Sequence, residues 1–254
     1  MALAPSLIKE VILVTDEKGR RYLARLRDEM VSIQNLGTIR ADAIRDALGS
    51  GELVIGGKKF SIRPATVDDV ISVIERKAQM LTAKDIAMMI HLCDVRCGSR
   101  VVEGGAGSGA LSIALLASVG EEGQVITYEI REDFAEIAKR NVEMASLAGA
   151  WTLKIGNICK EIGERDLDAL LIDIPNPWDC VGTARQALRV GGRFCAFVPN
   201  VNQVEKGVHA LRDNGYSDVR AVETMQRDLV VHEGGVRPSF DMLGHTGYLV
   251  LARR

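Results

Sequence analysis

The sequence has no apolar run of membrane-spanning length, and only 4% of its 254 residues are aromatic. A bilayer-spanning helix needs about 20 consecutive apolar residues. The first residues, MALAPSLIKEV, lack the basic start and long apolar core of a signal peptide. The composition, 47% hydrophobic and 26% charged, is typical of a globular protein with a sizeable core. We therefore expect a cytoplasmic protein that is not anchored in a membrane.

The cysteines show neither a CxxC motif nor the dense spacing of a disulfide framework. They are Cys93, Cys97, Cys159, Cys180 and Cys195. This pattern predicts reduced thiols, as is usual in the cytoplasm. His91, Cys93 and Cys97 lie close together in the sequence, but a fourth ligand at a recognised spacing is missing. We therefore expect no metal site.

Positive charge is not in excess, since 32 Lys and Arg residues face 34 Asp and Glu residues. No global basic field therefore marks the chain as a nucleic-acid-binding protein. A local basic cluster in the first segment is typical of a solvated face, with contact to an anionic partner as the alternative. Its members are Lys18, Arg20, Arg21, Arg25, Arg27, Lys58 and Lys59.

Two segments, residues 1–65 and 66–254, differ in pattern and predict two domains. The first has short alternating runs and turn signals, as expected of a small β-rich domain. Helical spacing follows at residues 67–95, and strand-like and helix-like runs alternate from residue 100. This alternation predicts an α/β fold with a doubly wound, mainly parallel sheet. After Gly215, two extended stretches joined by a segment without helical spacing are expected to pair as an antiparallel edge.

The stretch EGGAGSG, residues 103–109, lies between a strand-like and a helix-like run. In doubly wound sheets, ligands bind at the carboxyl ends of the strands, and glycines there let a ligand approach the main chain. Glu129 ends the next strand, where a carboxylate can accept hydrogen bonds from ribose hydroxyls. A nicotinamide dinucleotide and S-adenosylmethionine both fit this pattern. Glu103 favours the second, because a carboxylate before the glycines would oppose a pyrophosphate and suits a cationic amino acid end.

The segment from EGGAGSG to EIAKRN resembles the cofactor half of class I S-adenosylmethionine-dependent methyltransferases. Along nearly the whole chain, further motifs are similar to the tRNA (adenine-N1) methyltransferases of archaea and bacteria. They are DEKGRRYLARL, RKAQMLTAKDIAMMI, LLIDIPNPW, VPNVNQV and RPSFDMLGHTGYLVLARR. The resemblance implies a Rossmann-like, seven-stranded sheet with an antiparallel C-terminal strand and a small N-terminal β domain. It also implies a homotetramer that methylates N1 of a T-loop adenosine in tRNA, at position 58 and in some archaea also at 57.

The resemblance further implies a set of site residues. The expected cofactor-binding residues are Gln79, Glu103, Gly104, Gly105, Gly107, Ser108, Gly109, Glu129, Asn157 and Asp173. The expected substrate-binding residues are Pro175, Trp178, Arg237 and His245.

Asp173, at the end of an apolar strand, is the expected catalytic residue. Attack through adenine N1 makes the base cationic, so a neighbouring carboxylate stabilises the developing charge and can accept an N6 proton. A base in the T-loop must be extruded to reach such a pocket.

Two positions depart from the family pattern. Thr82 and Ala83 stand where many relatives have Tyr-Pro, which removes an aromatic ring near the target base. Asn157 stands where the usual methyltransferase has an acid for the adenine amino group, and an amide can still hydrogen-bond but carries no charge. Both changes leave open which adenosine is modified.

Three other functions stay open. A small-molecule methyltransferase is one, because the corrin-ring methyltransferases have a similar lead into the glycine loop; the N-terminal module and the ending HTGYLVLARR speak against it. A non-catalytic tRNA-binding subunit is another, opposed by the intact Glu103, Glu129 and Asp173. A NAD-dependent oxidoreductase is the third, opposed by Glu103 and by the lack of an evident Tyr-x-x-x-Lys relay.

Overall fold

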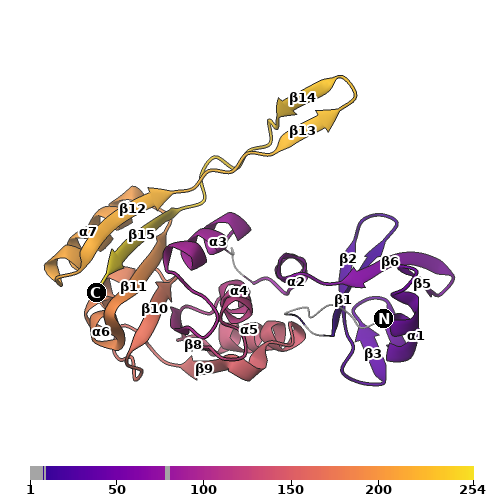
Figure 1. The fold of residues 1–254 in the computed structure, drawn as a ribbon, viewed down its shortest axis with the longest axis horizontal. Helices are drawn as coiled ribbons and strands as arrows, with labels where there is room; N and C mark the ends of the chain where they lie inside the picture. Colours follow the sequence, from indigo (N-terminus) through magenta and orange to yellow (C-terminus); the bar gives the residue numbers. More distant parts are fainter. Residues whose placement is uncertain (1–7, 9, 78–80) are drawn as a thin grey trace.

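The computed structural model describes residue 8 and the ranges 10–77 and 81–254. These residues form a four-stranded sheet near the N-terminus and a seven-stranded sheet after it (Figure 1). Two short hairpins stand outside both sheets. Within the described residues, no helix is both long and apolar enough to cross a membrane.

The first sheet is antiparallel throughout and confirms the predicted β-rich start of the chain. Its strand order is β2-β1-β6-β5, and these strands are β1 (Val11–Asp16), β2 (Arg21–Arg25), β5 (Glu52–Ile55) and β6 (Lys58–Pro64). The hairpin of β3 (Met30–Ile33) and β4 (Gly37–Arg40) and the helix α1 (Ala41–Ala47) share one core with this sheet. Gly56 and Gly57, with φ of +56° and +77°, form the predicted turn between β5 and β6.

Two helices, α2 (Val67–Val73) and α3 (Ala83–Leu92), follow the first sheet. α2 lies between the two sheets (Figure 1) and begins with a capping box formed by Thr66 and Asp69. The buried Asp69 carboxylate also accepts hydrogen bonds from Arg63 and Arg21, which joins α2 to the first sheet. The helix ends at Val73, earlier than the helical spacing predicted, because the backbone at Ile74 turns extended.

The second sheet has the strand order β12-β15-β11-β10-β7-β8-β9. Its strands are β7 (Arg100–Gly104), β8 (Gln124–Glu129), β9 (Trp151–Ile155), β10 (Leu167–Ile172), β11 (Leu188–Val198), β12 (Ser217–Glu223) and β15 (Tyr248–Arg253). The five strands from β11 to β9 are parallel, which confirms the predicted doubly wound sheet. β15 pairs antiparallel with both β11 and β12. The two closing stretches therefore pair as predicted, but the antiparallel strand lies second from the edge rather than at it.

Helices cover both faces of the second sheet and bury two separate cores. The helices after α3 are α4 (Ala110–Val119), α5 (Glu132–Met144), α6 (Val181–Ala187) and α7 (Val201–Asp213), with short 3-10 turns η1 (Ala148–Ala150) and η2 (Pro177–Cys180). Residues of α2 to α5 pack on one face of the sheet, and residues of α6 and α7 pack on the other. Because both faces are covered, central parallel strands such as β10 are nearly continuous apolar runs in the sequence.

Between β12 and β15 the chain forms an arm that the sequence did not predict. β13 (Leu229–His232) and β14 (Gly235–Pro238) pair as an antiparallel hairpin. In Figure 1 this hairpin projects away from the two large sheets. We call residues 225–243 the arm.

Candidate active site

The carboxyl ends of four neighbouring strands bring most of the predicted cofactor residues to one edge of the sheet. In the order β10-β7-β8-β9, Asp173 follows β10, the glycine loop follows β7, Glu129 ends β8 and Asn157 follows β9. The strand order reverses between β7 and β10, which is where ligands of open α/β sheets bind. Gln79, another predicted cofactor residue, lies outside the described residues.

The glycine loop lies directly against the backbone of Asp173. The Asp173 N–H donates a hydrogen bond to the Gly104 carbonyl oxygen (2.8 Å). At Gly105, with φ of +89°, an added Cβ would stand 2.3 Å from the Asp173 carbonyl oxygen, so no side chain fits there. At Gly107, with φ of +51°, an added Cβ would meet open space. The loop is therefore closed toward Asp173 and open at Gly107, as a cradle for a ligand would be.

Glu129 holds the glycine loop in place. Its Oε2 accepts a hydrogen bond from the Ala106 N–H (3.0 Å), and its Oε1 accepts from the Ile130 and Arg131 N–H groups (2.8 and 2.9 Å). A carboxylate has about four acceptor positions. About one therefore remains for a ribose hydroxyl, where the sequence predicted contacts to both.

Glu103 is fully buried, and its two oxygens differ. Oε2 accepts hydrogen bonds from Ser112 (2.5 Å) and Thr127 (2.6 Å), whereas Oε1 has no hydrogen-bond partner among the described residues. Burial raises the pKa of Glu103 to about 8, the two hydroxyls lower it, and the nearby Asp173 and Glu129 carboxylates raise it further. An unpartnered oxygen beside an open glycine cradle fits a ligand with a cationic or hydrogen-bond-donating group.

Asp173 lines a cavity of about 400 Å³. Burial raises the pKa of its carboxyl group to about 6, so the group is mostly ionised at pH 7. The other walls come from the start of α3, the loop after Asp173, the end of β11, α7 and the segment before β15. Among the lining residues are Thr82, Asp85, Pro175, Phe197, Gln203 and Thr246. Most of these positions are far apart in the sequence. The family resemblance had placed only Thr82 and Pro175 near the target base, and no local pattern indicated the others.

Of the four predicted substrate residues, Pro175 lines this cavity and the other three do not. Trp178 packs in η2, with the Lys206 ammonium 5.1 Å from its ring centre. Both ring nitrogens of His245 are bonded within the chain, Nδ1 to Glu223 (2.7 Å) and Nε2 to the Pro199 carbonyl (2.9 Å). Arg237 lies on β14 in the arm, with its guanidinium 4.5 Å from the Phe240 ring centre. The β13–β14 hairpin projects away from the two large sheets (Figure 1), whereas Asp173 directly follows β10 of the second sheet.

Asn157 is exposed and caps its own loop, because its side-chain oxygen accepts a hydrogen bond from the Cys159 N–H (2.9 Å). Two larger cavities, of about 430 and 510 Å³, lie elsewhere and contain none of the predicted site residues. Within the part of the chain that the structure describes, no group of three His, Cys, Asp or Glu side chains is arranged to hold a metal ion, and His91, Cys93 and Cys97 form no such group.

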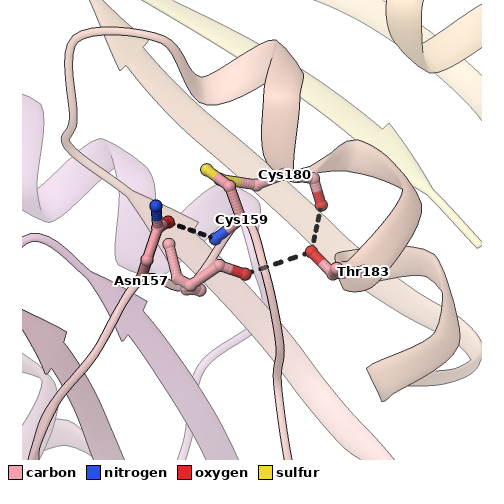
Figure 2. The surroundings of a disulfide bond; sticks show 5 residues. Asn157, Cys159, Cys180 and Thr183 are labelled. Atoms are coloured by element: carbon pink, nitrogen blue, oxygen red, sulfur yellow. Dashed lines mark hydrogen bonds between the residues drawn. A yellow bond between two sulfur atoms is a disulfide. The ribbon is translucent and has the colours of Figure 1, made fainter.

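The prediction that all cysteines are reduced is wrong for two of them. Cys93, Cys97 and Cys195 are free, whereas Cys159 and Cys180 form a disulfide (Figure 2). Next to it, the Thr183 hydroxyl bonds to the carbonyl oxygens of Cys180 (2.9 Å) and Ile158 (3.2 Å). The disulfide joins the Asn157 loop to the turn that follows the Asp173 loop. Spacing alone could not reveal it, because the two cysteines meet only where the connection from β9 to β10 passes η2.

The disulfide should contribute about 3 kcal/mol to the free energy of unfolding, since it closes a loop between residues 21 positions apart. We expect the Cys159→Ser/Cys180→Ser variant to be less stable than the oxidised wild type by about that amount in urea unfolding. A reductant should lower the free energy of unfolding of the wild type to that of the double variant. The control Cys97→Ser, which removes an exposed free thiol, should match the wild type both with and without the reductant. A wild type that does not respond to the reductant would show that these thiols are not paired in solution.

Comparison with known proteins agrees with this geometry. The family model for the tRNA methyltransferase complex GCD14 subunit matches residues 70–237. A tRNA (adenine(57)-N(1)/adenine(58)-N(1))-methyltransferase from Methanocaldococcus jannaschii is 34% identical over 268 residues, covering 95% of this chain and 94% of the relative. A tRNA (adenine(58)-N(1))-methyltransferase from Thermus thermophilus is 31% identical over 246 residues, covering 96% of each.

Among solved structures, a SAM-dependent O-methyltransferase from Thermotoga maritima superposes with a TM-score of 0.81. It is 29% identical, and the match covers 99% of this chain and 94% of that one. The sheet order, the glycine cradle and these matches over nearly the full length agree, and the chain belongs to the tRNA methyltransferase family described by the GCD14 subunit.

Proposed function

We propose that the protein transfers the methyl group of S-adenosylmethionine to N1 of an adenosine in the T-loop of tRNA, at position 58 or at both 57 and 58. One observation carries this proposal. The backbone of Asp173 lies against the glycine cradle, while its side chain lines the 400 Å³ cavity. A carboxylate therefore stands where a cofactor in the cradle and a base in the cavity would meet.

In this proposal, each residue at the carboxyl edge of the second sheet binds a different part of the cofactor. The glycine loop would receive the adenosyl part, Glu129 would accept a ribose hydroxyl, and Asn157 would hydrogen-bond the adenine. Glu103, with its unpartnered oxygen, would receive the cationic amino group. S-adenosylmethionine supplies a methyl group on a positively charged sulfur, which leaves as a neutral thioether.

Asp173 would act on the base. As the lone pair of N1 forms its bond to the methyl carbon and the carbon–sulfur bond breaks, positive charge moves onto the adenine. The ionised Asp173 carboxylate stabilises that charge and accepts the N6 proton. Because the cavity is partly closed to water, this attraction is stronger than it would be in solution.

Replacing Asp173 tests this role directly. Asp173→Asn keeps the shape but not the charge, so the rate of 1-methyladenosine formation should fall at least about 100-fold. In the wild type, kcat/KM should fall below a pH of about 6, because protonation of Asp173 removes the required carboxylate. Unmodified tRNA with methyl-labelled cofactor, followed by digestion and nucleoside mass spectrometry, gives the rate.

The control is Asp179→Asn, an exposed acid in η2 that does not line the cavity, and this variant should match the wild type. Wild-type activity in Asp173→Asn would contradict the assigned role. If the wild type binds the cofactor but labels no nucleoside in several tRNAs, a small-molecule methyltransferase becomes the better description.

We further propose that residues 1–65 and 66–254 are separate domains and that the first helps to bind tRNA. A separate apolar core in the first sheet and the exposed Lys18, Arg27 and Lys58 support this. Binding that depends on such residues should weaken steeply as salt rises, and titrations without any loss would contradict it. With tRNA as substrate, the expected location is the cytoplasm.

The arm supports a homotetramer. It exposes apolar side chains that the chain's own sheets do not cover, including Leu229, Val231, Val236 and Phe240. An exposed apolar patch of this kind is typical of a contact surface, and a second copy is the partner we propose. From this arm, Arg237 would contact tRNA bound at a neighbouring copy.

Substitution in the arm tests the assembly. Val231 is 75% exposed and pairs across the hairpin with Val236. In analytical ultracentrifugation we expect the wild type to sediment as a tetramer and the Val231→Glu variant as smaller species. The substitution would place a charge in the apolar contact between copies. Val190→Glu, at an equally exposed position outside the arm, is the control. A monomeric wild type at micromolar concentration would contradict the tetramer.

A further inference from the structure

A nearly buried lysine lies beside residues that line the Asp173 cavity. The Lys84 side chain is 11% exposed, and its ammonium donates hydrogen bonds to Asp85 Oδ1 (2.7 Å) and Thr246 Oγ1 (2.6 Å). Asp85 is 1% exposed, and its Oδ2 accepts from the Thr82 hydroxyl (2.7 Å). Lysine is rarely buried unless it is paired, and these two hydrogen bonds supply the partners that the buried ammonium requires.

The bridge joins parts of the chain that are 162 residues apart. Asp85 belongs to the first turn of α3, whereas Thr246 belongs to the segment that leads into β15. Thr82, Asp85 and Thr246 all line the cavity together with Asp173. The lysine therefore determines how closely two walls of this cavity approach each other.

The residue next to Thr246 is fixed as well. Both ring nitrogens of His245 face acceptors, the Glu223 carboxylate and the Pro199 carbonyl, so the doubly protonated ring satisfies both. The bond to Glu223 raises the pKa of His245 most, Pro199 raises it further, and the Lys84 charge lowers it. Residues 245 and 246 are thus held by β12, by the end of β11 and by α3.

Lys84 also reduces the negative charge around the cavity. Its ammonium neutralises the buried Asp85, which leaves the negative charge of the lining with Asp173. A second unpaired carboxylate would repel Asp173 and favour its protonated form.

We propose that Lys84 is a positioning residue for the methyl transfer: it holds Thr246 against the first turn of α3 and thereby fixes the cavity that receives the target base. This role rests on the proposed function. It assigns no contact between Lys84 and either the base or the cofactor.

Thr246→Val tests the bridge without changing any charge. The substitution removes the acceptor hydroxyl, keeps the side-chain shape and leaves the Lys84–Asp85 ion pair in place. Loss of a hydrogen bond from a charged donor predicts a fall in kcat of about tenfold. The Kd for S-adenosylmethionine should change by less than about twofold, because the glycine loop is not touched. Thr246→Ser, which keeps the hydroxyl, should recover most of the lost rate.

A second pair of substitutions tests the lysine itself. Lys84→Met/Asp85→Asn removes both charges together, so no carboxylate is left buried without its partner. The kcat of this variant should fall as far as that of Thr246→Val. A kcat equal to the wild type in either variant would overturn the proposal.

Titration of His245 by NMR in the free protein adds a readout that needs no substrate. If the bridge fixes residues 245 and 246, Thr246→Val loosens the bonds from His245 to Glu223 and Pro199, and the pKa of the ring falls toward 6.5. Thr246→Ser should keep the wild-type titration. An unchanged titration in Thr246→Val would overturn the proposal even if the protein methylates tRNA. A wild type without tRNA activity would refute the proposed function, while the titration would still test the bridge.

Discussion

The backbone contact between the glycine loop and Asp173 is the constraint on which the site depends. Because Gly105 has no side chain, the turn after β7 can lie against the carbonyl of Asp173, and the Asp173 N–H can reach the Gly104 oxygen. This contact places a cofactor cradle and a reactive carboxylate within one small region, although the two belong to strands separated by β8 and β9 in the sequence. Methyl transfer needs proximity more than elaborate catalytic groups, and this contact supplies it.

Three carboxyl groups, those of Glu103, Glu129 and Asp173, gather around this contact. The charges of Glu129 and Asp173 both raise the pKa of the buried Glu103. The negative charges of such a cluster repel one another, and a bound cation relieves this repulsion. The donor and the methylated base both carry positive charge, so the same electrostatics serves binding and reaction.

Much of the fold and part of the site could be predicted from the sequence. Local patterns were enough for the parallel strands, the glycine loop and the position of Glu129, because each depends on a short run of residues. The Cys159–Cys180 disulfide and the Lys84–Thr246 bridge were not predictable, since both depend on which strand ends meet in space. The arm was missed because its short strands pair only with each other. For His245, the family resemblance implied a contact with substrate, whereas the structure uses both ring nitrogens internally.

The most direct test of the carboxylate cluster is calorimetric titration of the protein with S-adenosylmethionine at pH 7, in two buffers of different ionisation enthalpy. Glu103, with a pKa of about 8, is mostly protonated in the free protein. Arrival of the cationic amino group should therefore release close to one proton, and NAD should give no binding heat. Binding of S-adenosylmethionine without proton release, or binding of NAD in its place, would contradict the account.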